Sequence, residues 1–295
     1  MKLFDSHAHL DDEKFEIDRD DMIKKIHKEN VDKFVSAGYS LKGSKKAIEL
    51  SKKYEFIYAT CGISPNDIPQ TEEELWKMLE EIEQLAKENM LKNNGKVVAI
   101  GEIGLDYYWN TDNKELQKKA FIGQIKIANK LDLPIVIHTR EAVMDTLRIL
   151  KENPVENKGI FHCCPLNREL VKEGLKLGFY ISFAGPVTFK NSKNADEIIS
   201  MVPNDKILIE TDSPYLAPEP VRGTRNDPRN VVYIAKKIAD VKNMTLEEIA
   251  EVTYKNAEMI FKMWEKGARF FLIKKFNQST KKSSISGRFF GCLYK

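Results

Sequence analysis

The sequence predicts a single-domain α/β fold, a (β/α)8 barrel of the TIM type, on the strength of three observations. Short segments with strand character alternate with amphipathic segments eight times, which is typical of parallel strands joined by right-handed crossovers. Eight such units in about 260 residues are what a barrel of this class requires. Reactive side chains gather near the C-terminal ends of several strands, where such barrels build their sites. An open doubly wound sheet shares the alternation but not this distribution.

The predicted strands are short, rich in Val, Ile, Phe or Tyr, and bounded by turn-forming or charged residues. In chain order they cover residues 3–9, 33–39, 56–62, 97–104, 134–140, 159–164, 179–185 and 206–212. Apolar residues in the other segments recur with helical spacing. The expected helices cover residues 18–30, 43–53, 72–91, 114–131, 141–152, 166–177, 192–202, 227–240 and 245–264. The last helix opens with Thr245 and Glu248, the pattern of a capping box.

The composition excludes several classes of protein. No apolar run reaches the length of a membrane span, and the first residues lack the apolar core of a secretory signal. The four cysteines show neither a disulfide framework nor zinc-ribbon spacing, so reduced thiols are expected. We therefore expect a cytoplasmic protein with no membrane contact and no obligate protein partner.

The net charge of +3 is misleading because the end of the chain is unusually basic. Residues 265–295 carry eight Lys or Arg and one acidic residue, which leaves 39 basic and 43 acidic residues in 1–264. The body is therefore mildly acidic, and the overall charge is no sign of nucleic-acid binding. We expect a barrel at 1–264 followed by a disordered basic tail at 265–295. A surface contact with nucleic acid, or a folded cap, remains an alternative for the tail.

Four imidazoles and two carboxylates stand at the ends of five predicted strands. This is the ordinary ligand set of catalytic divalent metals. A lone strand histidine is usually structural, but chance does not place six such residues in equivalent positions. His27 lies inside a predicted helix and is expected at the surface. The candidate metal ligands are His7, His9, Glu102, His138, His162 and Asp212.

Strand alternation predicts where these side chains point. His7 and His9 are two residues apart, so both face the barrel interior. The same rule turns Ile100 and Glu102 inward on the fourth strand. Asp5 is expected below the histidines, either orienting a ligand or serving the structure. The same two alternatives hold for Glu210 on the last strand.

Six ligands exceed what one tetrahedral zinc ion needs, but they suit two ions that share a carboxylate. Such a pair lowers the pKa of bound water toward about 7 and so supplies hydroxide as the nucleophile. Asp212 is placed to accept its proton, and Glu102 is the expected bridge, which makes these two the candidate catalytic residues. The metals could be Mg, Mn or Zn. One ion is assigned to His7, His9, Glu102 and Asp212, and the other to Glu102, His138 and His162.

Six segments closely resemble the TatD family of metal-dependent deoxyribonucleases, a branch of the amidohydrolase-like barrels. They are FDSHAHLDD, GEIGLDYY, IHTRE, FHCC, GFYISFAGPVTFK and IETDSPYLAPEPVRGTRNDP. The resemblance runs from residue 3 to about residue 262 in the family's order and spacing. It implies a TIM-type barrel, a dinuclear site and hydrolysis of DNA phosphodiesters, and it carries the family's ligands onto the same six residues. It gives no support to the tail. Where the family often has His before Pro after the third strand, this chain has Ser64, which puts substrate binding there in doubt.

A phosphodiester also needs cationic groups beside the metals. The loop after the last strand supplies Arg222 and Arg225, and loops in this place are recurrent phosphate sites whose geometry suits guanidinium. Arg225 and Arg222 could instead tie the loop to the barrel. Arg140, two residues past His138, is a further candidate. Tyr107 and the two aromatic residues after it could stack on a base or pack the loop down.

The leading hypothesis is a divalent-metal deoxyribonuclease with DNA as its substrate. The first rival is an amidohydrolase or esterase that cleaves a cyclic amide, lactone or aminoacyl ester. Many such barrels bridge their metals with a carboxylated lysine on the fourth strand, whereas this chain has Glu102 there and no lysine within VVAIGEIG. The second rival, a barrel that only binds, would be favoured by a lost ligand, and none is lost.

We expect truncation after Trp264 to leave folding and most activity intact, because all eight strand–helix units end before it. The melting temperature of residues 1–264 should stay within about 2 °C of the full chain. A large drop on truncation would show instead that the tail stabilises the barrel.

Overall fold

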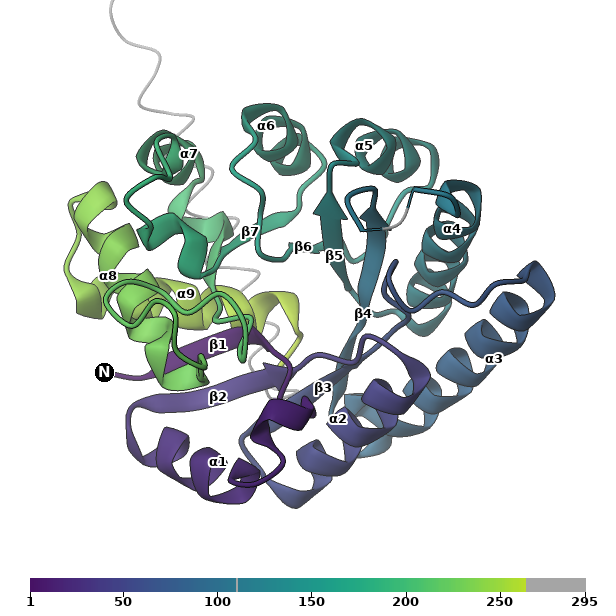
Figure 1. Ribbon diagram of the computed structural model, residues 1–295, viewed down its shortest axis with the longest axis horizontal. Coiled ribbons are helices and arrows are strands. Elements are labelled where there is room, and N and C mark those ends of the chain that lie inside the picture. The colour runs from purple at the N-terminus through teal and green to yellow at the C-terminus, as the bar shows by residue number, and fades with distance from the viewer. Residues whose placement is uncertain (110, 264–295) are drawn as a thin grey trace, which may run out of the picture. The chain divides into compact units, whose positions relative to one another are not determined.

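The computed structural model describes residues 1–109 and 111–263, and Met1–Phe261 form one compact unit. The predicted tail at 265–295 lies outside the described residues. In the compact unit eight parallel strands follow one another in chain order, with the helices outside them (Figure 1). This confirms the predicted barrel. The strands are β1 (Leu3–Ala8), β2 (Val31–Ser36), β3 (Ile57–Cys61), β4 (Val97–Asp106), β5 (Ile135–Arg140), β6 (Gly159–Phe161), β7 (Tyr180–Phe183) and β8 (Ile207–Ile209).

Each expected helix is present in the described residues, with ends shifted by a few positions. They are α1 (Arg19–Lys28), α2 (Leu41–Lys53), α3 (Glu72–Asn89), α4 (Lys114–Leu131), α5 (Val143–Glu152), α6 (Arg168–Lys176), α7 (Ala195–Met201), α8 (Val231–Lys242) and α9 (Leu246–Ile260). Short 3-10 turns join some of them, at η1 (Glu13–Phe15), η2 (Leu91–Asn93), η3 (Gly185–Thr188), η4 (Asn204–Lys206) and η5 (Pro228–Asn230).

Polar side chains fix the starts of several helices. Ser40, Thr71 and Asn167 each accept a hydrogen bond from a backbone N–H in the first turn of α2, α3 and α6. Such caps satisfy amides that have no partner within the helix. The predicted capping box is confirmed at α9, where Thr245 and Glu248 bond to each other's backbone N–H.

The barrel closes where the ends of β1 and β8 meet. The backbone N–H of Asp212 donates to the carbonyl of His7 at 3.0 Å, and that of His9 donates to the carbonyl of Ser213 at 2.7 Å. These bonds join residues that are about 200 positions apart in the chain. Because three of the four residues in the seam are candidate ligands, closing the barrel also assembles half of the site.

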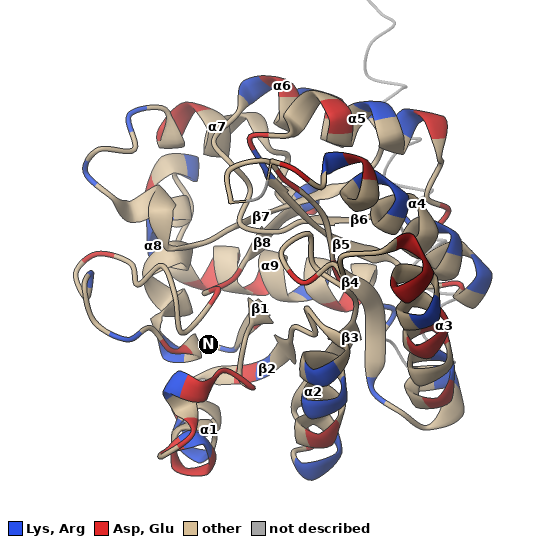
Figure 2. Cartoon of the chain, turned by 45° about the vertical axis from the view of Figure 1, so that its right-hand side comes forward, with Lys and Arg blue, Asp and Glu red and all other residues tan. Residues whose placement is uncertain are grey.

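The core fills the space between the strands and the surrounding helices. Phe34, Ile135 and Phe161 on the strands belong to one continuous buried cluster with apolar residues of the helices, such as Ile23 and Ile234. Charged residues of both signs gather on the helices, while the central strands carry few (Figure 2). None of the helices in the described part of the chain has both the length and the apolar character needed to cross a membrane.

Strand β4 departs from the simple alternation that the sequence suggested. Ile100 pairs with Ile135 and Ile103 with Ile137, so three steps on β4 match two on β5. All four isoleucines belong to the buried cluster that also contains the apolar residues of the helices. The expectation that Ile100 faces the interior is therefore wrong. The extra residue of this bulge restarts the alternation, and Glu102 within it points inward toward the histidines.

Gly104 allows β4 and β5 to approach closely, and an alanine there should be costly. Its φ is +139°, and a Cβ would lie 2.0 Å from the carbonyl oxygen of His138. We expect Gly104→Ala to destabilise the fold by about 2–5 kcal/mol in denaturant unfolding. Gly223→Ala is the matched control, because Gly223 has φ +88° but open space around it, and only the backbone cost of about 1–2 kcal/mol applies. Equal losses in the two variants would contradict the steric argument.

Candidate metal centre

Four ligand atoms from three parts of the chain converge at the end of the β1–β8 seam. His7 Nε2 lies 3.3 Å from His9 Nε2, 3.4 Å from Glu102 Oε2 and 3.7 Å from Asp212 Oδ1. His9 Nε2 lies 3.6 Å from Glu102 Oε2 and 3.2 Å from Asp212 Oδ1. These five distances are nearly equal, and the atoms of His7, His9 and Glu102 form one compact group of donors.

This spacing fits a metal ion. Three donors 3.3–3.6 Å apart, as in His7, His9 and Glu102, leave room for an ion about 2.0–2.2 Å from each of them, which are the usual zinc–nitrogen and zinc–oxygen distances. Asp212 Oδ1 is buried and accepts no hydrogen bond within the described residues. A buried carboxylate oxygen in that condition is costly unless a cation satisfies it.

A second group of ligand atoms adjoins the first. The other oxygen of Glu102, Oε1, lies 3.0 Å from His138 Nδ1 and 3.4 Å from His162 Nε2. The two imidazole nitrogens are 3.3 Å apart. Three donors arranged in this way can hold one face of a second ion. The structure therefore brings all six predicted ligands together, with one oxygen of Glu102 in each group.

The electrostatics of the cluster favour a bound cation. Burial alone would raise the pKa of Glu102, but His162 and His138 hold that pKa well below its usual range. Burial would lower the pKa of His9, yet Asp212 and Glu102 raise it to about 9. The ionised forms of Glu102 and Asp212 are thus favoured, and these carboxylates favour a positive charge beside them, which a divalent ion can supply.

The ligands at the seam are held by a buried carboxylate. Asp5 accepts hydrogen bonds from the backbone N–H and the hydroxyl of Thr211 and from the backbone N–H of His7. It therefore fixes the chain just before Asp212, a residue with the unusual φ of +54°. Burial raises the pKa of Asp5 well above its usual range. Of the two alternatives for Asp5, the contacts favour a structural one that positions backbone.

Glu210 lies beside a ligand imidazole as its charge partner. Its Oε1 lies 3.4 Å from His162 Nδ1 and also accepts the backbone N–H of Cys163. A carboxylate on the second nitrogen of a ligand imidazole fixes which nitrogen faces the metal. His162 thus presents Nε2 to Glu102, as the site requires.

Asp106 plays the same part for His138, and sequence reasoning missed it. Its Oδ2 lies 2.9 Å from His138 Nε2, which leaves Nδ1 facing Glu102. Its Oδ1 accepts the backbone N–H groups of Tyr108 and Trp109. Burial would raise the pKa of Asp106, but the bond to His138 and these N–H groups lower it to about 2. The one available signal was its place at the end of a strand, four residues after Glu102.

Two of the predicted substrate-binding residues are occupied with structural contacts. The guanidinium of Arg225 pairs with both carboxylate oxygens of Asp18, at 2.8 and 2.6 Å, and also donates to the carbonyl of Lys14. This favours the alternative in which Arg225 ties the loop to the barrel. The hydroxyl of Tyr107 donates to Asp145 at 2.7 Å, so Tyr107 packs its loop down onto α5.

The other two predicted residues keep their cationic groups available. Arg140 lies over the ring of Tyr108, with 3.8 Å between the guanidinium carbon and the ring centroid. Arg222 lies over Phe189 in the same manner at 4.2 Å. Both arginines are exposed. Neither side chain has a hydrogen bond or an ion pair to any residue that the structure describes.

Ser64 stands where the resembling family often has histidine. Its hydroxyl donates to Asp67 at 2.7 Å, and it accepts the backbone N–H of Asn66. The serine is buried, so it fixes the loop after β3. His27 is exposed and stacks on Phe56, as expected of a surface histidine.

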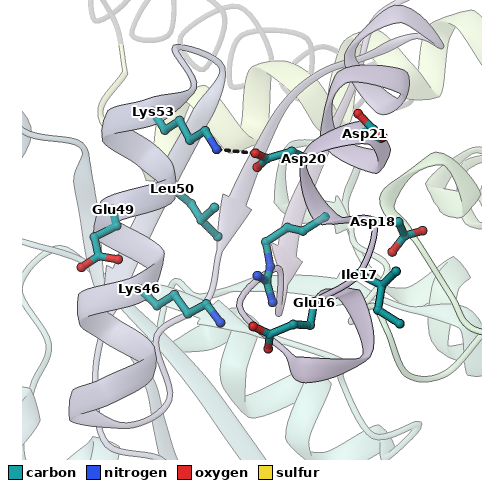
Figure 3. A pocket seen from close by; sticks show the side chains of 10 residues that line it. Glu16, Ile17, Asp18, Asp20, Asp21, Lys46, Glu49, Leu50 and Lys53 are labelled. Atoms are coloured by element: carbon teal, nitrogen blue, oxygen red, sulfur yellow. Dashed lines mark hydrogen bonds and ion pairs between the residues drawn. The ribbon is translucent and has the colours of Figure 1, made fainter.

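A pocket of about 430 Å³ lies between the start of α1 and α2, and none of the candidate ligands lines it. Figure 3 shows Lys53 of α2 paired with Asp20 of α1 across it. Asp18, the partner of Arg225, also lines this pocket. Asp20 and Asp18 are thus engaged in holding α1 to α2 and to the last loop.

Comparison with known proteins gives one consistent result. The profile of the family described as TatD related DNase matches residues 4–262. The chain is 44% identical over 263 residues to the uncharacterized metal-dependent hydrolase YabD of Bacillus subtilis, which covers 88% of this chain and 99% of that protein. It is 38% identical to the uncharacterized metal-dependent hydrolase YcfH of Escherichia coli K12, over 88% and 96%. The structure of YjjV, a TatD homolog from Escherichia coli, superposes with a TM-score of 0.81 at 23% identity, over 88% and 98%.

Asp106→Asn should weaken metal binding without removing a ligand, because an amide holds the His138 imidazole less firmly than a carboxylate does. We expect a loss of roughly 10- to 100-fold in the affinity for Zn²⁺ or Mn²⁺, measured by competition with a chelating dye. Asp145→Asn removes a carboxylate from Tyr107, Lys118 and Arg148, none of which is a candidate ligand, and serves as the control. Unchanged affinity in Asp106→Asn would show that Asp106 serves only the loop.

Proposed function

Because the chain belongs to the TatD related DNase family of metal-dependent hydrolases, we propose that it hydrolyses phosphodiester bonds of DNA with two divalent ions. The observation that carries this proposal is the position of Glu102. Each of its carboxylate oxygens faces a separate group of ligand nitrogens, at 3.4 and 3.6 Å on one side and 3.0 and 3.4 Å on the other. A carboxylate placed in this way suits a bridge between two ions.

The residues of the centre would have three roles: binding the metals, accepting a proton and orienting the ligands. One ion would be held by His7, His9, Glu102 and Asp212, and the other by Glu102, His138 and His162. When bound, such a pair supplies Lewis acidity toward a phosphoryl oxygen and makes a water molecule more acidic. Asp212 would accept the proton of the attacking water, since it lies at the open, C-terminal end of the barrel. Asp106 and Glu210 would hold the two imidazoles in the orientation that the site requires.

DNA is favoured over an amide or lactone by the chemistry of the rim. Arg140 ends β5 and Arg222 lies on the loop after β8, both with exposed guanidinium groups, and guanidinium matches the geometry of phosphate. The carboxylate of Glu102 also stands where many amidohydrolase barrels use a carboxylated lysine. An amidohydrolase or esterase nevertheless remains the rival, because it would use the same metals.

One assay separates these functions. Purified protein is incubated with end-labelled single-stranded DNA and, in parallel, with a panel of cyclic amides, lactones and esters. We expect Mg²⁺, Mn²⁺ or Zn²⁺ to support cleavage of the DNA and EDTA to stop it. Turnover of an amide or lactone without cleavage of DNA would overturn the proposal.

Glu102→Ala and Asp212→Ala should each reduce kcat on DNA by at least roughly 100-fold while the fold survives. Glu102 is the shared ligand, and Asp212 is both a ligand and the expected base. Circular dichroism and thermal melting check the fold, and His27→Ala is the matched control because His27 is exposed on α1. If Asp212→Ala kept a third of wild-type turnover at saturating metal, its assignment would be wrong.

A further inference from the structure

The rim of the barrel beside His138 carries two exposed aromatic side chains that no part of the fold requires. The side chain of Tyr108 is 49% exposed and that of Trp109 is 68% exposed. Both follow β4, and their rings meet edge to face with centroids 4.8 Å apart. Large aromatic residues exposed side by side usually mark a binding surface.

A cation completes this cluster. The guanidinium carbon of Arg140 lies 3.8 Å from the ring centroid of Tyr108 and 5.4 Å from that of Trp109. The strands place it there, because Arg140 on β5 pairs in register with Asp106 on β4, and these two strands are neighbours (Figure 1).

The guanidinium of Arg140 has no partner of opposite charge among the residues that the structure describes. Of the seven arginines in 1–109 and 111–263, only Arg140 and Arg222 have side chains without a hydrogen bond or ion pair to those residues. The others bind carboxylates or carbonyl oxygens, as in the paired contacts of Arg19, Arg148, Arg168, Arg225 and Arg229. The charge of Arg140 is therefore available to an anion from outside the chain.

The cluster is rigidly connected to the metal centre. One oxygen of Asp106 accepts the backbone N–H groups of Tyr108 and Trp109, and the other faces His138. Arg140 follows His138 by two residues on the same strand, or about 7 Å. A substrate whose phosphate lay at the metals would thus have its neighbouring unit against this cluster.

We propose that Arg140, Tyr108 and Trp109 form a nucleotide-binding platform beside the metal centre. Trp109 stacks on a nucleobase, and Arg140 binds the phosphate next to the scissile one. The chemistry matches that of proteins that bind single strands, which combine aromatic stacking with backbone cations and show little preference for sequence. This inference rests on the proposed phosphodiesterase function and assigns the part of the substrate that lies beyond the metals.

The first test compares two substrates that differ only in their bases. They are a short oligothymidylate and an oligomer of the same length whose nucleosides are all replaced by abasic tetrahydrofuran units. We expect Trp109→Ala to raise KM for oligothymidylate roughly tenfold and to leave KM for the abasic oligomer within about twofold. Trp109→Phe should restore most of the affinity. Trp76→Ala is the matched control, because Trp76 is 43% exposed on α3 and bonds to Glu72.

Arg140 should behave differently from Trp109. Arg140→Ala removes a phosphate contact, so KM should rise for both oligomers, and the slope of log KM against log salt should become shallower by about 0.7. Arg148→Ala is the control, since Arg148 is paired with Asp145. If Trp109→Ala changed KM equally for oligothymidylate and for the abasic oligomer, the stacking role would be overturned. An unchanged salt slope in Arg140→Ala would overturn the phosphate contact.

A binding measurement separates this inference from the proposed function. In a Trp76→Phe/Trp264→Phe variant, Trp109 is the one remaining tryptophan. With EDTA present, oligothymidylate should quench its fluorescence in a saturable manner, and the abasic oligomer should not. Quenching without any metal-dependent cleavage would contradict the proposed function and support the platform. Cleavage without quenching, and without an effect of Trp109→Ala on KM, would contradict the platform alone.

Discussion

The metal centre is arranged around one buried carboxylate, that of Glu102. Burying an ionised carboxylate is expensive unless charges and hydrogen bonds compensate. Here His7, His9, His138 and His162 surround both of its oxygens. The bulge in β4 turns the side chain inward, and a Cβ on the preceding Gly101 would lie 2.6 Å from the Cβ of Val136. The backbone at this point therefore directs the carboxylate of Glu102 toward the imidazoles as well as forming part of the barrel.

Barrel closure and site assembly are the same event at the β1–β8 seam. Asp5 binds the backbone of His7 and Thr211, and the N–H of Asp212 donates to the carbonyl of His7. The two ends of the sheet thus meet through residues that carry ligands or adjoin them. A bound ion would add its own free energy to this seam, because it would bind the closed barrel and not the open chain. The barrel in turn holds the donors at distances that suit a metal, so little reorganisation is needed on binding.

The sequence predicted the barrel and the convergence of six ligands because strand ends and residue types are local features. It did not predict the bulge that moves Ile100 to the helix side, since a bulge depends on the register with the neighbouring strand. Asp106 was missed for a related reason, because its partner His138 lies 32 residues away on β5. Arg225 could be recognised as cationic, but its pairing with Asp18 is a long-range contact that no local pattern encodes.

Long-range contacts also decide which arginines of the loops have a structural role and which are available to a substrate. Arg225 lies within reach of Asp18, and Arg229 within reach of Asp227, so their charges are neutralised and their guanidinium groups fix the last loop. The guanidinium of Arg140 contacts the rings of Tyr108 and Trp109, which hold it in place without removing its charge. A mildly acidic body would otherwise repel a polyanion. A few positioned cations beside a metal centre can overcome that repulsion locally. The net charge of the chain does not reveal such a local site.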